Sequence, residues 1–175
     1  PLHTTRNYNG QLSGQEGIHA FWESRVTELF ADEYDMFVGA AAYEERVALR
    51  AWKAVRQANS ALDSVLRFER ELSLKMKPEH KYVLEDRNGV IMKTYSREFS
   101  QRYHQMLNQQ VERQMRASVK MVGDFCLYSY RWAYYDDGFS SFFNEKIRKN
   151  YLFRAIAYCY SSFLLFGLYF LFSTQ

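Results

Sequence analysis

The chain has 175 residues, a length that suits a single domain with a substantial hydrophobic core. Its 23 basic and 20 acidic residues are interleaved and the formal net charge is only +3, so the composition points to no polyanionic partner. No run of Lys or Arg indicates a nucleic-acid-binding surface. Only two prolines occur, and the long stretches without a strong helix breaker favour a mainly helical protein.

The first helix is expected after a glycine-rich loop. Gly10, Gly14 and Gly17 fall within the opening residues and are typical of turns. From Ile18 onwards, apolar residues recur at intervals of three and four, which places them on one helix face: Phe21, Trp22, Val26, Leu29 and Phe30. Trp22 is expected to anchor the core rather than to contact a substrate.

A long helix and a hairpin are predicted next. Helical spacing of apolar residues predicts a helix from about Tyr43 to Met76, which Pro78 ends. A short hairpin is expected near residues 81–95, because Asn88-Gly89 is a favourable two-residue turn between YVLEDR and VIMKTY.

The last strongly patterned segment is again helical. Ser96 is a suitable start for a helix over about residues 97–132, whose buried stripe is expected to include Tyr103, Leu107 and Val111. Residues 1–132 therefore look like one α-helical unit without an internal linker or repeat.

The composition changes after residue 132, so residues 133–175 are interpreted as a divergent tail. Residues 155–172 form an uncharged apolar core of 18 residues, which meets the lower length for a membrane span. Three interpretations stay open for this segment: a membrane anchor, a buried terminal helix, or an artefact of the sequence. Cys126 and Cys159 lie in no metal-binding or redox spacing, and they leave the redox compartment open.

One group of residues is a candidate metal site. His19 and Glu23 are four residues apart on a predicted helix, so both side chains leave the same face and can reach one ion. Imidazole nitrogens and carboxylate oxygens are good zinc ligands. His3 precedes the glycine-rich loop and could close onto the first turn of that helix. By spacing alone, an exposed polar pair on a helix explains His19 and Glu23 at least as well.

Other chemistry finds little support in the sequence. None of the motifs GxGxxG, GxxxxGK[ST], GxSxG or HExxH occurs. Acidic residues such as Glu69 and Glu71 alternate with arginines, as they do on solvent-exposed helix surfaces. His80 and His104 have no acidic partner at metal-binding spacing, so both are expected on the surface. The sequence indicates no protein partner.

Two segments resemble a known family. The combination of PLH with a downstream IHAFWES after a glycine-rich loop resembles the zinc-dependent phospholipase C / S1–P1 nuclease superfamily, in particular the bacterial zinc-dependent phospholipase C family proteins. The segment VERQMRASVKMVGDF is similar to the last helix of those proteins. The resemblance covers about residues 1–132 and does not extend into the tail.

The resemblance implies an all-α, multi-helix fold and a zinc-dependent hydrolase of phosphate esters. It implies that His3, His19 and Glu23 are zinc ligands of a trinuclear Zn²⁺ cluster, and that the substrate is a phosphodiester in a phospholipid or a nucleic acid. In such sites, zinc ions activate water for attack on phosphorus and stabilise charge on the phosphoryl oxygens.

The resemblance also implies that the chain is an N-terminally truncated fragment with an incomplete site. The remaining ligands and the catalytic residues are expected upstream of Pro1, and no substrate-binding residue is assigned. The resemblance suggests an extracytoplasmic location. Membrane contact through residues 155–172 would apply if the apolar segment is a membrane anchor. The alternatives are a non-catalytic helical protein with a degenerate site, with or without a membrane tether, and an unrelated helical interaction module.

Overall fold

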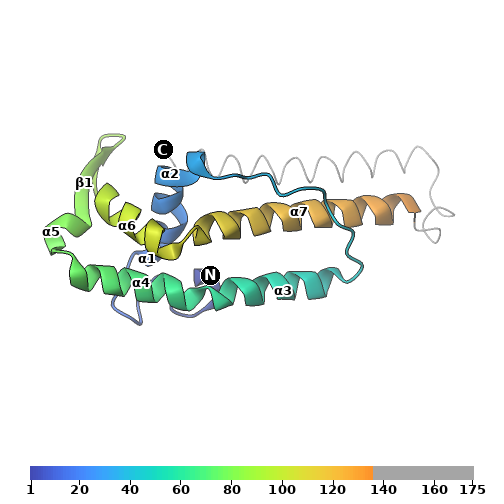
Figure 1. The fold of residues 1–175 in the computed structure, drawn as a ribbon, viewed down its shortest axis with the longest axis horizontal. Coiled ribbons are helices and arrows are strands. Elements are labelled where there is room, and N and C mark those ends of the chain that lie inside the picture. The colour runs from blue at the N-terminus through green and yellow to red at the C-terminus, as the bar shows by residue number, and fades with distance from the viewer. Residues whose placement is uncertain (136–175) are drawn as a thin grey trace. The chain divides into compact units, whose positions relative to one another are not determined.

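The computed structural model describes the backbone of residues 1–135 and the side chains of residues 1–131. These residues are mostly helical and contain one two-stranded sheet, which agrees with the predicted mainly α class (Figure 1). The apolar segment 155–172, Cys159 and almost all of the predicted tail lie outside the described residues. Within residues 1–135, none of the helices combines the length and the apolar character that a membrane span requires.

The described residues belong to two compact units. The first consists of Pro1–Phe37 and Ala51–Ala117, and the second includes Val38–Arg50 and residues 118–135. The chain passes from the first unit to the second after Phe37, returns inside helix α3 (Val47–Ser60) and passes to the second again inside helix α7 (Gln110–Tyr135). All three candidate metal ligands belong to the first unit.

The predicted helix from Ile18 is present. After a single 3₁₀ turn, η1 (Leu2–Thr4), and the glycine-rich loop, the chain forms α1 (Ile18–Ala20), the π-helical turn η2 (Phe21–Arg25) and α2 (Val26–Phe30) in succession. A further 3₁₀ turn, η3 (Ala31–Glu33), follows. Four of the five residues of the predicted stripe, Phe21, Trp22, Val26 and Phe30, are at most 6% exposed, and the fifth, Leu29, is partly buried. The predicted role of Trp22 as a core residue agrees with this burial.

The helix predicted from Tyr43 to Met76 starts later and is interrupted. It begins at Val47 with α3, because the Arg46 amide donates to the Glu44 side chain instead of to a helical carbonyl. It breaks at Ala61, and α4 runs over Leu62–Lys75. The Ala61 amide bonds to the carbonyl of Ala58, three residues back, which is a tighter turn than an α-helix makes.

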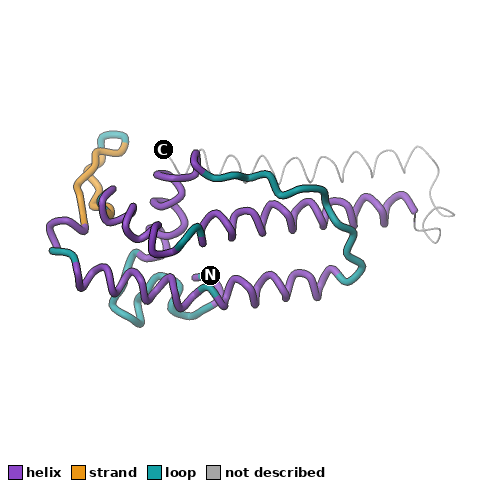
Figure 2. The backbone as a smooth tube through the Cα atoms, viewed as in Figure 1, coloured by secondary structure: helices purple, strands orange, loops and turns teal. Residues whose placement is uncertain are grey.

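The predicted hairpin is confirmed. After the short helix α5 (Pro78–Lys81), β1 (Tyr82–Arg87) and β2 (Val90–Tyr95) form an antiparallel hairpin (Figure 2). Arg87 pairs with Val90 beside the turn. Asn88 and Gly89 have φ of 57° and 81°, the positive values that a tight two-residue hairpin turn requires.

The helix predicted over 97–132 is divided into two. Ser96 caps α6 (Arg97–Leu107) by accepting a hydrogen bond from the Phe99 amide at 3.1 Å. Asn108 and Gln109 then take positive φ values and break the helix before α7. The break lets the buried side chain of Gln110 donate to the carbonyl of Ala61 and to the hydroxyl of Ser64.

The core of the first unit is rich in stacked aromatic rings. The ring of Phe21 stacks on Tyr95 at 3.8 Å between centroids and also contacts Phe99 and Tyr103. This cluster joins the helix formed by α1, η2 and α2 to the hairpin and to α6. The buried apolar residues of this core are Leu2, Ile18, Phe21, Trp22, Val26, Phe30, Val65, Leu72, Met76, Tyr95, Phe99, Tyr103, Leu107 and Val111.

The second unit is organised around Asp124. This carboxylate is 4% exposed, accepts a hydrogen bond from the Ala42 amide at 2.7 Å and pairs with Lys120 and Arg50. The ring of Tyr43 stacks on Tyr128 with 6.0 Å between centroids. These contacts hold the extended segment before α3 against α7 within this unit.

Candidate metal centre

Three polar side chains converge at the start of the chain. The Nε2 atom of His19 lies 3.0 Å from Nε2 of His3 and 3.0 Å from Oε2 of Glu23. The third side of the triangle, from Nε2 of His3 to Oε1 of Glu23, measures 3.4 Å. His3, His19 and Glu23 are the one group of at least three potential metal ligands found among the described residues.

The local fold explains why these side chains meet. Leu2 is fully buried and fixes the turn that carries His3. Ile18 and Trp22 turn toward the core, and the next residues along the chain, His19 and Glu23, lie on the adjacent, partly exposed face one turn apart. The predicted pairing of His19 with Glu23 therefore has its structural basis in the amphipathic helix.

The aromatic ring of Tyr8 lies beside both imidazoles. Its ring is parallel to that of His3 at 6.4 Å between centroids and nearly perpendicular to that of His19 at 5.7 Å. The two imidazoles themselves meet edge to face at 4.7 Å. These contacts help to orient the imidazole rings while the Nε2 atoms stay directed at Glu23.

The donor set fits a zinc ion. Tetrahedral zinc with bonds of 2.0–2.1 Å to nitrogen or oxygen separates its ligand atoms by about 3.3 Å, and the observed spacings are 3.0, 3.0 and 3.4 Å. Two imidazole nitrogens and one carboxylate form a ligand set known from catalytic zinc sites, where three protein ligands leave one position open. The same spacings also suit hydrogen bonds among the three side chains. The geometry is therefore compatible with a bound metal ion and does not require one.

The other two histidines do not join this group. His80 is exposed, as predicted, and its Nδ1 atom lies 3.4 Å from Oε2 of Glu98 without a third potential ligand. The prediction for His104 was wrong. Its ring stacks on Phe30 at 4.7 Å and packs near Tyr34, and burial lowers its pKa.

Glu69 was also wrongly predicted to lie on the surface. It is 1% exposed and accepts hydrogen bonds from Gln15 at 2.5 Å and Ser73 at 2.8 Å, while Lys81 lies 2.8 Å from its carboxylate. The available signal was its position between Val65 and Leu72 on the apolar stripe of α4, a place where an acidic residue requires buried partners.

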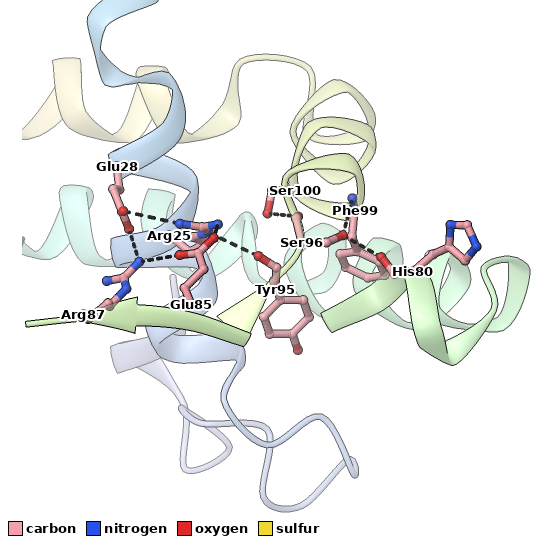
Figure 3. A network of polar contacts seen from close by, with 9 residues as sticks. All are labelled: Arg25, Glu28, His80, Glu85, Arg87, Tyr95, Ser96, Phe99 and Ser100. Carbon is pink, nitrogen blue, oxygen red and sulfur yellow. Dashed lines mark hydrogen bonds and ion pairs between the residues drawn. The ribbon is translucent and has the colours of Figure 1, made fainter. Parts of the chain in front are cut away.

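A second polar network fixes the hairpin to the helix that carries His19 and Glu23. Arg25, whose side chain is 7% exposed, donates to the carbonyl of Tyr95 at 3.2 Å and pairs with Glu28 and Glu85 (Figure 3). Arg87 pairs with Glu28 at 2.7 Å. Because these charges neutralise one another, the network supplies rigidity rather than a binding surface for an anion.

The chain matches no protein-family model, no curated protein and no solved structure. Among the described residues, the convergence of His3, His19 and Glu23 at ligand-like spacing is the structural observation that bears on function.

Proposed function

We propose that the chain is part of a zinc-dependent hydrolase of phosphate esters related to the zinc-dependent phospholipase C / S1–P1 nuclease superfamily. The observation that carries this proposal is the arrangement of His3, His19 and Glu23, whose donor atoms all lie within 4.8 Å of one another. The mostly helical structure is compatible with the all-α fold of that superfamily.

In this proposal, His3, His19 and Glu23 hold one Zn²⁺ ion. Zinc in such a site activates water for attack on phosphorus and stabilises the charge that develops on the phosphoryl oxygens. The partly exposed position of the three side chains supports access by a substrate from solvent. The substrate class is a phosphodiester, carried by a phospholipid or by a nucleic acid.

The proposed site is a partial one. A trinuclear cluster needs more ligands than the three residues found together here, and the described residues contain no second group of this kind. We therefore expect this chain alone to bind zinc and to hydrolyse phosphodiesters little or not at all. The extracytoplasmic location and the membrane contact through residues 155–172 remain predictions.

The test combines zinc content with hydrolysis of bis(p-nitrophenyl) phosphate by the natural protein that contains this chain. His19→Ala and Glu23→Ala are expected to lose zinc and activity together, because each removes one ligand atom. His80→Ala is the matched control, since it removes an exposed histidine that pairs with one carboxylate only. Zinc binding without hydrolysis would favour the non-catalytic alternative, whereas unchanged zinc and unchanged rate in both ligand variants would refute the assignment.

A further inference from the structure

We propose that Gln15 and Glu69 are positioning residues for the candidate metal centre. Gln15 ties the end of the loop that leads into the helix of His19 to the buried carboxylate of Glu69, and so helps to hold that helix in place relative to the turn that carries His3. This inference rests on the proposed metal binding, but it does not depend on the hydrolytic reaction.

The backbone of Gln15 is fixed to the helix that carries His19. Its amide donates to the carbonyl of Gly10 at 3.0 Å, which closes a tight turn in the loop. Its own carbonyl accepts from the Ile18 amide at 3.1 Å, at the first residue of α1. A displacement of Gln15 would therefore change both the loop and the start of the helix.

The side chain of Gln15 anchors the loop to α4. Its Nε2 atom donates to the carbonyl of Leu66 at 2.7 Å and to Oε2 of Glu69 at 2.5 Å. The other side-chain hydrogen bonds that residues 5–17 make in the described part of the chain stay within the loop. Gln15 thus links residues 5–17 to α4, while Thr4, next to His3, accepts a separate hydrogen bond from Asn59 of α3 at 2.9 Å.

Glu69 provides a fixed partner for that link. Its Oε1 atom is held by Lys81 and Ser73, each at 2.8 Å, which leaves Oε2 directed at Gln15. Glu69 is 1% exposed, so water can hardly replace the hydrogen bond from Gln15. Loss of that bond would leave a carboxylate oxygen buried without its donor, which is strongly unfavourable.

The anchor affects how the two ends of the loop meet, because Leu2 and the hydrogen bond from Asn59 to Thr4 hold the His3 end separately. His19 and Glu23 share one helix, whereas the side chain of His3 is 68% exposed and comes from the other end of the loop. Without the anchor, a metal ion would have to order the loop on binding, and that entropic cost would reduce affinity. Partners that hydrogen bond directly to metal ligands typically contribute 10- to 100-fold to affinity, and Gln15, which acts through the loop, is expected to contribute less.

The test measures Zn²⁺ affinity of the 175-residue chain by competition with a chromophoric chelator, together with the Co²⁺ absorption spectrum and the thermal midpoint. Gln15→Met keeps the length of the side chain and removes both hydrogen bonds. Leu72→Ala is the control, because it removes buried apolar volume from α4, where Glu69 also lies. Each variant is measured well below its own midpoint.

Gln15→Met is expected to weaken Zn²⁺ binding by up to about 10-fold, the lower end of the effect of a direct ligand partner, and to alter the Co²⁺ spectrum. Leu72→Ala is expected to lower the midpoint more, with affinity near that of the wild type. Should Gln15→Met fail to fold, Gln15→Asn, which shortens the side chain, is expected to weaken binding in the same direction. Unchanged affinity in the Gln15 variant, or an equal loss in Leu72→Ala, would overturn the inference alone. Absence of Zn²⁺ binding by the wild type would overturn the proposed metal site as well.

Discussion

A Cβ atom at Gly10 would lie only 2.2 Å from the carbonyl oxygen of Gln15. Gly10 also has φ of +78°, a conformation that other L-residues rarely adopt. The loop therefore needs glycine at this position for two separate reasons. The backbone of Gln15 packs directly on Gly10.

Gly10→Ala is expected to destabilise the loop by clearly more than the roughly 1–2 kcal/mol that a left-handed conformation costs an ordinary residue. Gly14→Ala is the matched control, because Gly14 has φ of +68° in the same loop but no atom within 4 Å of the added methyl group. Urea unfolding of both variants measures the difference. Equal free energies of unfolding would mean that the close contact with Gln15 is absent.

Glu69 gives the fold a specific sensitivity to acid. Burial pushes the pKa of Glu69 upward, but the hydrogen bonds from Lys81, Gln15 and Ser73 outweigh it and lower the pKa below its ordinary value of 4.5. A lowered folded-state pKa stabilises the protein above pH 4.5, and this contribution is lost as the pH falls through the folded-state value. The wild type should therefore lose stability in this acidic window.

Glu69→Gln is expected to lower the free energy of unfolding at pH 7 by on the order of 3 kcal/mol, because it leaves Lys81 without its charged partner. Its stability should also fall less between pH 5 and pH 3 than that of the wild type. Glu71→Gln on the same helix is the control, since Glu71 is 40% exposed and pairs with Arg67 only at 3.7 Å. Identical pH profiles for the wild type and Glu69→Gln would contradict this account.

Phe21 is expected to be the most sensitive residue of the aromatic cluster. It is 1% exposed and stacks on Tyr95 at 3.8 Å between ring centroids, so Phe21→Ala should cost about 3–5 kcal/mol. Leu84→Ala on the hairpin, where the side chain is 69% exposed, should stay within about 0.5 kcal/mol of the wild type. Denaturant unfolding measures both, and a similar small cost at the two positions would mean that the cluster is loosely packed.

Local sequence patterns identified the elements that local physics controls. The Asn88-Gly89 turn located the hairpin to the residue, because those two positions must take positive φ values. The apolar stripe from Ile18 located the first helix, and the four-residue spacing brought His19 to Glu23. In each case, the interactions that matter lie within a few residues of one another.

The predictions that failed concern helix breaks and burial that depend on residues distant in the sequence. The breaks at Ala61 and Asn108 contain neither proline nor glycine, and they coincide with the contact of Gln110 to the Ala61 carbonyl. The burial of Glu69 depends on Lys81 and Gln15, which lie far from it in the sequence. The approach of His3 to His19 likewise depends on how the intervening loop closes, which spacing alone does not specify.

The most direct test of the central claim is a calorimetric titration of Zn²⁺ into this chain and into its His19→Ala variant, with His80→Ala as the control. We expect one ion per chain for the wild type and for His80→Ala. We expect His19→Ala to lose more Zn²⁺ affinity than the 10- to 100-fold typical of residues that only orient a ligand. A wild-type chain that binds no zinc, or a His19→Ala variant that binds it equally well, would contradict the claim that His3, His19 and Glu23 form a metal site.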